Sequence, residues 1–312
     1  MLTGGLQKLT TLDFPGVVSS IVFTKGCNFR CPYCHNPELV ALGFYLKNPK
    51  HQSTSDADLM PHATGQPTQA ATVQEAATTV PANASQLLEH SSAAQTSHGQ
   101  AATSAPSPYC GNLEPRAEME ELFRFLHKRQ GLIDGLVISG GEPCLQPDLP
   151  EFCREVRKLG YKIKLDTNGS RPQMLQTLLD SSLLDYVAMD LKTLPAAYFK
   201  YGFCREADIE SRLLQTMDIL RDCGLPYEYR TTCVAPFIDR EIILELAQLI
   251  GASGRTGMAG AAKTDTPWYF QKARLNNVLS PETPMEALSD ETVAELVAEA
   301  AKLAPKAALR GE

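Results

Sequence analysis

Three cysteines near the amino terminus are the residues best suited to chemistry. The segment from Lys25 to Asn36 reads KGCNFRCPYCHN, so Cys27, Cys31 and Cys34 have the spacing C-x3-C-x2-C. With nine cysteines in 312 residues, this spacing arises by chance with a probability on the order of 0.01. We therefore interpret the three thiols as ligands of one metal centre.

The number of ligands favours iron–sulfur chemistry over zinc. A structural zinc ion would want a fourth protein ligand, and His35 directly follows Cys34, which is too close for the usual ligand spacing. Three thiolates suit a four-iron, four-sulfur cluster in which one iron has no protein ligand and keeps an open coordination position. Buried apolar cysteines and a zinc knuckle are the alternatives.

A glycine pair and a glutamate form a second candidate group. The sequence SGGEP at 139–143 follows a predicted strand. Gly140 and Gly141 would let the backbone approach a ligand closely, and Glu142 could then meet an ammonium group. A simple turn with a solvated glutamate is the alternative.

Polar residues also end the next three predicted strands. DTNG at 166–169 ends one of them, although Asn-Gly alone is only a turn signal. Asp190 and Lys192 are two residues apart, so both can point into one site, and a solvated ion pair is the alternative. Arg230 on the following strand could offer a bidentate fork to a carboxylate.

Alternating strands and helices must position these residues. Strands are predicted at 17–23, 136–138, 162–165, 186–189, 227–234 and 268–271, and helices at 149–159, 174–184, 209–223 and 238–250. Repeated βα units specify a parallel sheet covered by helices, as an open doubly wound sheet or as a partial barrel. In both architectures the chemistry lies at the carboxyl ends of the strands.

The motifs together resemble the radical S-adenosylmethionine (SAM) superfamily. CHN at 34–36 resembles its glycyl-radical-enzyme activating branch, and the likeness is greatest to anaerobic ribonucleoside-triphosphate reductase activating proteins. The segments that carry the resemblance are 11–16 (TLDFPG), 23–38, 138–143 (ISGGEP), 164–169 (KLDTNG), 186–192 and 229–232 (YRTT).

The resemblance implies a fold, a cofactor and a set of site residues. The fold is α/β, a partial (β/α)6 radical SAM barrel. The open iron of a [4Fe-4S] cluster on the catalytic Cys27, Cys31 and Cys34 is chelated by the amino and carboxylate groups of SAM, which is reductively cleaved to methionine and a 5'-deoxyadenosyl radical. The residues expected to bind SAM are Asn36, Gly140, Gly141, Glu142, Asp166, Asn168, Asp190, Lys192 and Arg230.

A cation beside SAM is a further expectation. Asp166 and Asp190 would converge with the SAM carboxylate, and two unit charges about 4 Å apart interact by roughly 4 kcal/mol at an effective dielectric constant of about 20. We therefore expect a monovalent or divalent cation held by oxygen atoms of Asp166, Thr167 and Asp190.

The function expected from the resemblance is an oxidoreductase that generates a glycyl radical on a partner enzyme, anaerobic ribonucleoside-triphosphate reductase, with flavodoxin or ferredoxin as the reductant. One alternative is a radical SAM enzyme with a small-molecule substrate, like carboxy-deazaguanine synthase. Another is a non-catalytic iron–sulfur or zinc-binding module. Cys144 is expected to be a packed loop thiol or a neighbour of the pocket.

Composition excludes several other classes. Acidic residues (36) outnumber basic ones (29), and the net charge of −7 argues against nucleic acid as the main partner. The chain has no apolar run long enough to span a membrane and no signal peptide pattern. An odd number of cysteines fits a reducing compartment, so we expect a cytoplasmic protein.

One segment differs from the rest of the chain. Between residues 51 and 108, 29 of 58 residues are Ala, Ser or Thr, and none is Lys, Arg or a large aromatic residue. We interpret 48–112 as a disordered insertion, since it cannot bury enough apolar surface to order itself. Residues 1–47 and 113–312 then form the two parts of one barrel, and a loosely helical arm that docks on it is the alternative.

Replacement of residues 51–108 by a short Gly/Ser linker is expected to leave SAM cleavage and the melting temperature nearly unchanged, because few buried contacts would be lost. Thermal unfolding and an anaerobic assay for 5'-deoxyadenosine measure both. A large fall in melting temperature would show that the segment packs on the barrel.

Overall fold

The computed structural model describes residues 1–40, 115–252 and 266–310. The predicted insertion at 48–112 falls outside these residues. The two parts of the predicted barrel that flank it are described in large part.

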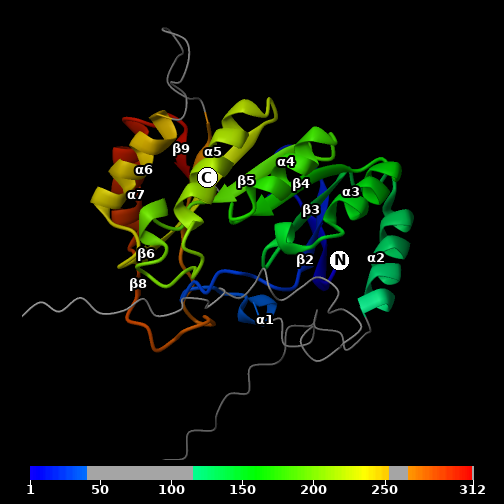
Figure 1. The fold of residues 1–312 in the computed structure, drawn as a ribbon, viewed down its shortest axis with the longest axis horizontal. Coiled ribbons are helices and arrows are strands. Elements are labelled where there is room, and N and C mark those ends of the chain that lie inside the picture. Colours follow the sequence, from blue (N-terminus) through cyan, green and yellow to red (C-terminus); the bar gives the residue numbers. More distant parts are fainter. Residues whose placement is uncertain (41–114, 253–265, 311–312) are drawn as a thin grey trace, which may run out of the picture. The chain divides into compact units, whose positions relative to one another are not determined.

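A mostly parallel sheet forms the centre of the described chain (Figure 1). Its strand order is β1-β2-β3-β4-β5-β6-β7-β9, in which β2 to β7 run parallel in sequence order and β1 is antiparallel to β2. β9 is parallel to β7, and the short β8 pairs with β6. The strands are β1 (Thr3–Thr10), β2 (Ser19–Thr24), β3 (Gly135–Gly140), β4 (Lys162–Thr167), β5 (Tyr186–Asp190), β6 (Tyr227–Ala235), β7 (Trp268–Lys272), β8 (Glu286–Ala287) and β9 (Ala307–Leu309).

Helices follow the strands along the chain, and Figure 1 shows α2 to α6 one after another around the outside of the sheet. They are α1 (Pro37–Val40), α2 (Pro115–Arg129), α3 (Leu149–Lys158), α4 (Pro172–Asp180), α5 (Ile209–Asp222), α6 (Arg240–Ala252) and α7 (Asp290–Ala301), with short 3-10 turns η4 (Pro143–Leu145) and η5 (Pro195–Ala197). The six successive parallel strands and the helices that join them confirm the predicted α/β fold, a partial barrel.

Burial explains why these segments form these elements. In β3, Leu136, Val137 and Ile138 are all fully buried, as expected for a strand covered on both faces. On α3 the buried residues Leu149, Phe152, Cys153 and Val156 recur at helical spacing and form one apolar face.

The predicted helix at 174–184 ends earlier than its apolar pattern. α4 stops at Asp180, and Ser182 adopts a positive φ of 52°. Leu183 and Leu184 are buried in the turn that leads into β5. These two leucines are therefore apolar because they are buried in the turn, although they do not belong to the helix. The periodicity of the sequence alone does not distinguish the two cases.

The loop between β1 and β2 closes one end of the sheet's inner face. Phe14, from the TLDFPG segment, packs with Ile21, Val137 and Tyr186 in a small core that is separate from the main one. The ring centroids of Phe14 and Tyr186 are 6.1 Å apart. Asp13 fixes the loop, since its carboxylate accepts hydrogen bonds from Thr10 at 2.6 Å and from Arg310, just after β9, at 2.8 Å.

Phe14→Ala is expected to lower the free energy of unfolding by about 3–5 kcal/mol, because it removes a ring that is 3% exposed and leaves a cavity. Denaturant unfolding measures the change. Leu12→Ala in the same loop is the control: Leu12 is 80% exposed, so its loss should change stability by no more than about 0.5 kcal/mol. Equal losses of unfolding free energy in the two variants would contradict the packing of Phe14 in this small core.

Candidate active site

The three cysteines lie on the loop that leaves the carboxyl end of β2, and distant segments hold this loop. The amide of Glu142, beyond β3, donates to the carbonyl of Gly26 at 2.8 Å. The amide of Leu279, beyond β7, donates to the carbonyl of Cys34 at 3.0 Å, and that of Ser280 donates to the carbonyl of Pro32 at 3.0 Å. No motif in the sequence indicates that residues 279–280 contribute to the site.

Burial keeps two of the three thiols, those of Cys27 and Cys31, in their protonated form. Cys27 and Cys31 are buried and Cys34 is half-buried. Burial raises the pKa of Cys27 to about 12, with a contribution from nearby Glu142, and raises that of Cys31 to about 12 against the opposing charge of Lys192. Such thiols are protonated near neutral pH and become anionic ligands when a metal displaces the proton.

The donor set fits an iron–sulfur cluster in its chemistry. Among residues 1–40, 115–252 and 266–310, no group of three or more His, Cys, Asp or Glu side chains is arranged to hold a metal ion. The three thiols nevertheless share one short loop and are all free. The hydroxyl of Tyr33, within electrostatic reach of Cys31 and Lys192, is buried without a hydrogen-bond partner.

Gly140 and Gly141 allow β3 to approach the cysteine loop closely. Gly140 has a φ of 119°, and a Cβ there would collide with the backbone of Thr24. A Cβ on Gly141 would collide with the backbone of Gly26. The close approach that the structure shows is therefore between two segments of the protein itself, and contact of these glycines with SAM stays a prediction.

Glu142 is fully buried, so its interpretation as a solvated turn residue is wrong. One carboxylate oxygen accepts from the amide of Cys144 at 2.9 Å and from the hydroxyl of Thr167 at 2.7 Å, and the other accepts from the amide of Asn168 at 2.6 Å. Burial raises the pKa of Glu142 in spite of these bonds. Cys144 is a packed thiol in the same place, 4% exposed and 3.8 Å from the Thr167 hydroxyl.

Arg230 joins the two aspartates of the predicted site. Its Nε donates to Asp190 at 2.8 Å and one terminal nitrogen donates to Asp166 at 3.0 Å. Lys192 lies 3.3 Å from Asp190, and Lys164 lies 2.9 Å from Asp166. Burial alone would raise the pKa of both carboxyls, but these cations lower each below its ordinary value.

Lys164 and Glu228 are site residues that sequence reasoning missed. Lys164 is fully buried, lies 3.5 Å from Glu228 and stands over the ring of Tyr186, whose hydroxyl donates to Glu228 at 2.9 Å. Lys164 is two residues before Asp166 on β4, so the alternation of the strand places it on the same face. That spacing was the available signal.

The described site gives no support to the predicted cation at Asp166, Thr167 and Asp190. In the described inner face, three cations (Lys164, Lys192 and Arg230) pair with three carboxylates (Asp166, Asp190 and Glu228). The charge is compensated by the protein, and Thr167 directs its hydroxyl to Glu142 instead.

The remaining predicted residues lie at the same edge of the sheet. The side chain of Asn168 bonds Asn28 in the cysteine loop at 3.1 Å. Asn36 begins the turn into α1, where its carbonyl accepts from the amide of Leu39 at 3.0 Å. The structure thus brings the residues from 27–36, 140–142, 166–168 and 190–192 to the carboxyl ends of successive strands, and Arg230, in the middle of β6, lies level with Asp190 at the end of β5.

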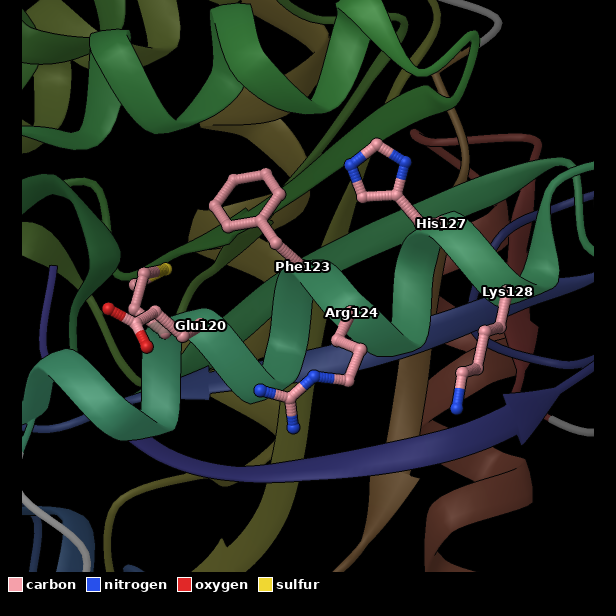
Figure 2. Close-up of a pocket in the computed structure, with 6 residues that line it drawn as sticks. Glu120, Phe123, Arg124, His127 and Lys128 are labelled. Carbon is pink, nitrogen blue, oxygen red and sulfur yellow. The ribbon is translucent and has the colours of Figure 1, made fainter.

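A hollow along α2 is separate from this group. It is lined by Met119, Glu120, Phe123, Arg124, His127 and Lys128, and Figure 2 shows Phe123 and His127 on one side of the helix and Arg124 and Lys128 on another. His127 is exposed.

The parallel strands, with polar side chains at their carboxyl ends and a cysteine loop after β2, define the site of an α/β barrel enzyme. The chain belongs to the radical SAM superfamily, whose family profile matches residues 94–250, half of the chain. The matched stretch contains β3 to β6 and begins after the cysteine loop.

The chain is similar to proteins with two kinds of name. A glycyl-radical enzyme activating enzyme of Methanocaldococcus jannaschii is 28% identical over 252 residues, 80% of this chain and 75% of the relative. The isethionate sulfite-lyase activating enzyme of Nitratidesulfovibrio vulgaris is 25% identical over 325 residues, 97% of this chain and 96% of the relative. A 7-carboxy-7-deazaguanine synthase of Neisseria meningitidis is 34% identical over 88 residues, 28% of this chain and 38% of the relative.

None of the helices in the described part of the chain is long and apolar enough to cross a membrane.

Arg230→Met is expected to lower the free energy of unfolding at pH 7 by about 3–5 kcal/mol, since Asp166 and Asp190 would lose a shared buried partner. The contribution of these carboxyls is present above their unfolded pKa of about 3.9 and is lost as the pH falls through their lower folded pKa values, so acidification should destabilise the wild type. Denaturant unfolding from pH 7 to pH 2 measures both effects, and the greater part of the acid-induced loss is expected below about pH 4.

Arg221→Met on α5 is the matched control. Arg221 also binds two carboxylates, Asp218 and Asp222, but both are exposed. Its loss is expected to cost no more than about 1 kcal/mol. Equal losses in the two variants would contradict a buried, tightly held role for Arg230.

Proposed function

We propose that the chain binds a [4Fe-4S] cluster through Cys27, Cys31 and Cys34 and uses it with SAM to generate a glycyl radical on a partner enzyme. The observation that carries this proposal is the meeting of the cysteine loop with the SGGE segment and the charged inner face at one edge of the sheet. Membership of the radical SAM superfamily supports the cofactor pair. The cluster supplies one electron, and SAM supplies the bond that is broken.

The protein's own residues would bind and orient SAM. Glu142 accepts three hydrogen bonds within the protein and lies near Cys27, where its carboxylate would also accept from an ammonium group. Lys192 and Arg230 each keep N–H donors beyond those that bind Asp190 and Asp166, and these can reach a carboxylate. Asn36, Gly140, Gly141 and Asn168 would complete the pocket.

A cluster of aromatic rings would exclude water from the cysteine loop. Tyr33 packs on Phe203 and Phe237 with ring centroids 5.8 and 5.6 Å apart, and Phe203 packs on Tyr198 at 5.8 Å. All four rings are buried. A dry site of this kind protects a reactive radical from side reactions.

The proposed partner is anaerobic ribonucleoside-triphosphate reductase, and the proposed electron donor is flavodoxin or ferredoxin. Two relatives that align with at least four fifths of this chain are named as activating enzymes. The resemblance at 34–36 and 11–16 supports the choice of partner. The proposal places the enzyme in the cytoplasm, where thiols stay reduced.

A small-molecule substrate is the second candidate. The match to a 7-carboxy-7-deazaguanine synthase favours it, although the match covers only 28% of this chain. Both candidates use the same cluster and SAM site, so they differ in the molecule that loses a hydrogen atom.

Anaerobically reconstituted protein is expected to hold about four irons per chain and, with dithionite and SAM, to release 5'-deoxyadenosine. Cys31→Ala should lose the cluster absorbance and the SAM cleavage. Cys223→Ala, which removes a half-buried cysteine outside the motif, should keep both. Full iron content in Cys31→Ala would overturn the cluster assignment.

The partner is tested in the same preparation. With an anaerobic ribonucleotide reductase from the same genome, the reaction should produce the doublet spectrum of a glycyl radical in electron paramagnetic resonance. If 5'-deoxyadenosine forms without a radical on that partner, the glycyl-radical proposal is wrong, and consumption of a deazaguanine precursor would support the second candidate.

A further inference from the structure

A chain of side chains connects Cys27 with an ion cluster at the start of α5. Glu206 is bound by both terminal nitrogens of Arg171, at 2.7 and 2.8 Å, and by Arg212 at 2.7 Å. The same carboxylate accepts a hydrogen bond from the side-chain amide of Asn28 at 3.0 Å. Asn28 directly follows Cys27 in the cysteine loop.

The carboxylate of Glu206 fixes the orientation of Asn28. Burial would raise the pKa of Glu206, but Arg171 and Asn28 lower it, so the group is ionised and only accepts hydrogen bonds. The nitrogen of the Asn28 amide must therefore face Glu206. Its oxygen then faces the opposite way, towards Asn168.

Asn168 is oriented in turn. Its oxygen accepts from the amide of Ser170 at 2.9 Å, and its nitrogen donates to the oxygen of Asn28 at 3.1 Å. The same nitrogen lies 3.8 Å from the sulfur of Cys27. Both N–H bonds of the Asn168 amide are thus directed, one to Asn28 and one to Cys27.

A hydrogen bond to Cys27 affects the electron affinity of whatever metal centre the sulfur holds. Hydrogen bonds to ligand sulfurs are among the factors that set the reduction potential of iron–sulfur clusters. Reduction adds negative charge, which an N–H donor stabilises, so the bond raises the potential. Cys27 also accepts from the backbone amide of Phe29 at 3.4 Å, but that donor does not depend on Glu206.

We propose that Glu206 is a positioning residue that acts through Asn28 to direct the Asn168 amide at Cys27 and so raises the reduction potential of the cluster. This inference rests on the cluster assignment made above and on no assumption about the substrate. It gives Glu206, which lies outside every motif found in the sequence, a role in the electron-transfer step.

Glu206→Gln reverses the order of donors and acceptors at nearly constant shape. Two arginine nitrogens donate to Oε2 and only one donates to Oε1, so the glutamine oxygen would take the Oε2 position, and its nitrogen would face Asn28 at the loss of one bond from Arg171. Asn28 would then turn its oxygen to residue 206 and its nitrogen to Asn168. Because the amide of Ser170 holds the Asn168 oxygen, the Asn168 amide cannot flip, and repulsion between the two N–H donors would move its nitrogen away from Cys27.

The experiment is a double-mutant cycle of Glu206→Gln and Asn168→Ala, read as the reduction potential of the reconstituted cluster without SAM. Titration with titanium(III) citrate, followed by electron paramagnetic resonance of the reduced cluster, gives each potential. Loss of the hydrogen bond should lower the equilibrium constant for reduction of the cluster about tenfold. This corresponds to a reduction potential that is lower by about 59 mV for one electron. The shift of the reduction potential caused by Glu206→Gln should therefore be about 59 mV more negative in the wild-type background than in the Asn168→Ala background.

The cycle separates the proposal from a simple charge effect. Removal of a negative charge alone would raise the potential, and it would do so equally in both backgrounds. Equal shifts therefore overturn the proposal. Glu151→Gln is the control, because Glu151 also pairs with an arginine at 3.0 Å but is exposed on α3, and it should leave the potential unchanged.

The experiment also distinguishes a failure of the cluster assignment from a failure of the proposed role of Glu206. If Asn168→Ala does not retain iron, Asn28→Ala replaces it in the cycle with the same criterion, since Glu206 acts only through Asn28. If the wild type binds no cluster at all, the cluster assignment is wrong and this inference falls with it. A wild type with full iron content and additive shifts would leave the cluster assignment intact and refute the role of Glu206.

Discussion

The inner face of the sheet depends on the ion pairs that the guanidinium of Arg230 makes with Asp166 and Asp190. Asp190 and Arg230 are neighbours in register on β5 and β6, and Arg230 also reaches Asp166 on β4. Three parallel strands therefore meet at one buried cation. Breaking such a group by removing one member leaves uncompensated charge in the interior, so the geometry of the site and the stability of the sheet are coupled.

This coupling explains why the inner face is polar while the outer face is apolar. Along β4, Ile163 and Leu165 belong to the main core, whereas Lys164 and Asp166 alternate with them and form ion pairs. The TLDFPG loop fills the opposite end of the inner face with Phe14. The inner face is thus closed by apolar contacts at one end and carries balanced charges towards the carboxyl ends of the strands.

The cysteine loop takes its shape from segments that are far away in sequence. Backbone amides of Glu142, Leu279 and Ser280 hold its carbonyl groups, and the amide of Arg30 donates to the carbonyl of Phe203 at 2.8 Å. Asn28 adds a side-chain link to the end of β4 and to Glu206. A change in any of these segments can therefore alter the position of the thiols without touching them.

The sequence by itself determined the βα alternation and the place of the chemistry. Six strand predictions coincide with β2 to β7, because buried parallel strands are short apolar runs and their residues at the carboxyl ends are polar. The spacing of Cys27, Cys31 and Cys34 needed no structure, since all three lie on one loop. β1, α7 and β9 were missed. β1 and β9 are defined by their pairing with β2 and β7, whereas the helical spacing of Val293, Leu296 and Ala300 was an available signal for α7.

Only the tertiary structure decided how the charges and donors pair. The sequence places Asp166 and Asp190 in one region, but it does not show that Lys164, Lys192 and Arg230 already neutralise them, and so it led to a cation that the structure does not support. The same holds for Glu206, which is 178 residues from Asn28 and bonds it directly. Spacing in sequence reports which residues share a strand face, whereas the partner of a buried charge depends on contacts between elements, which no local pattern records.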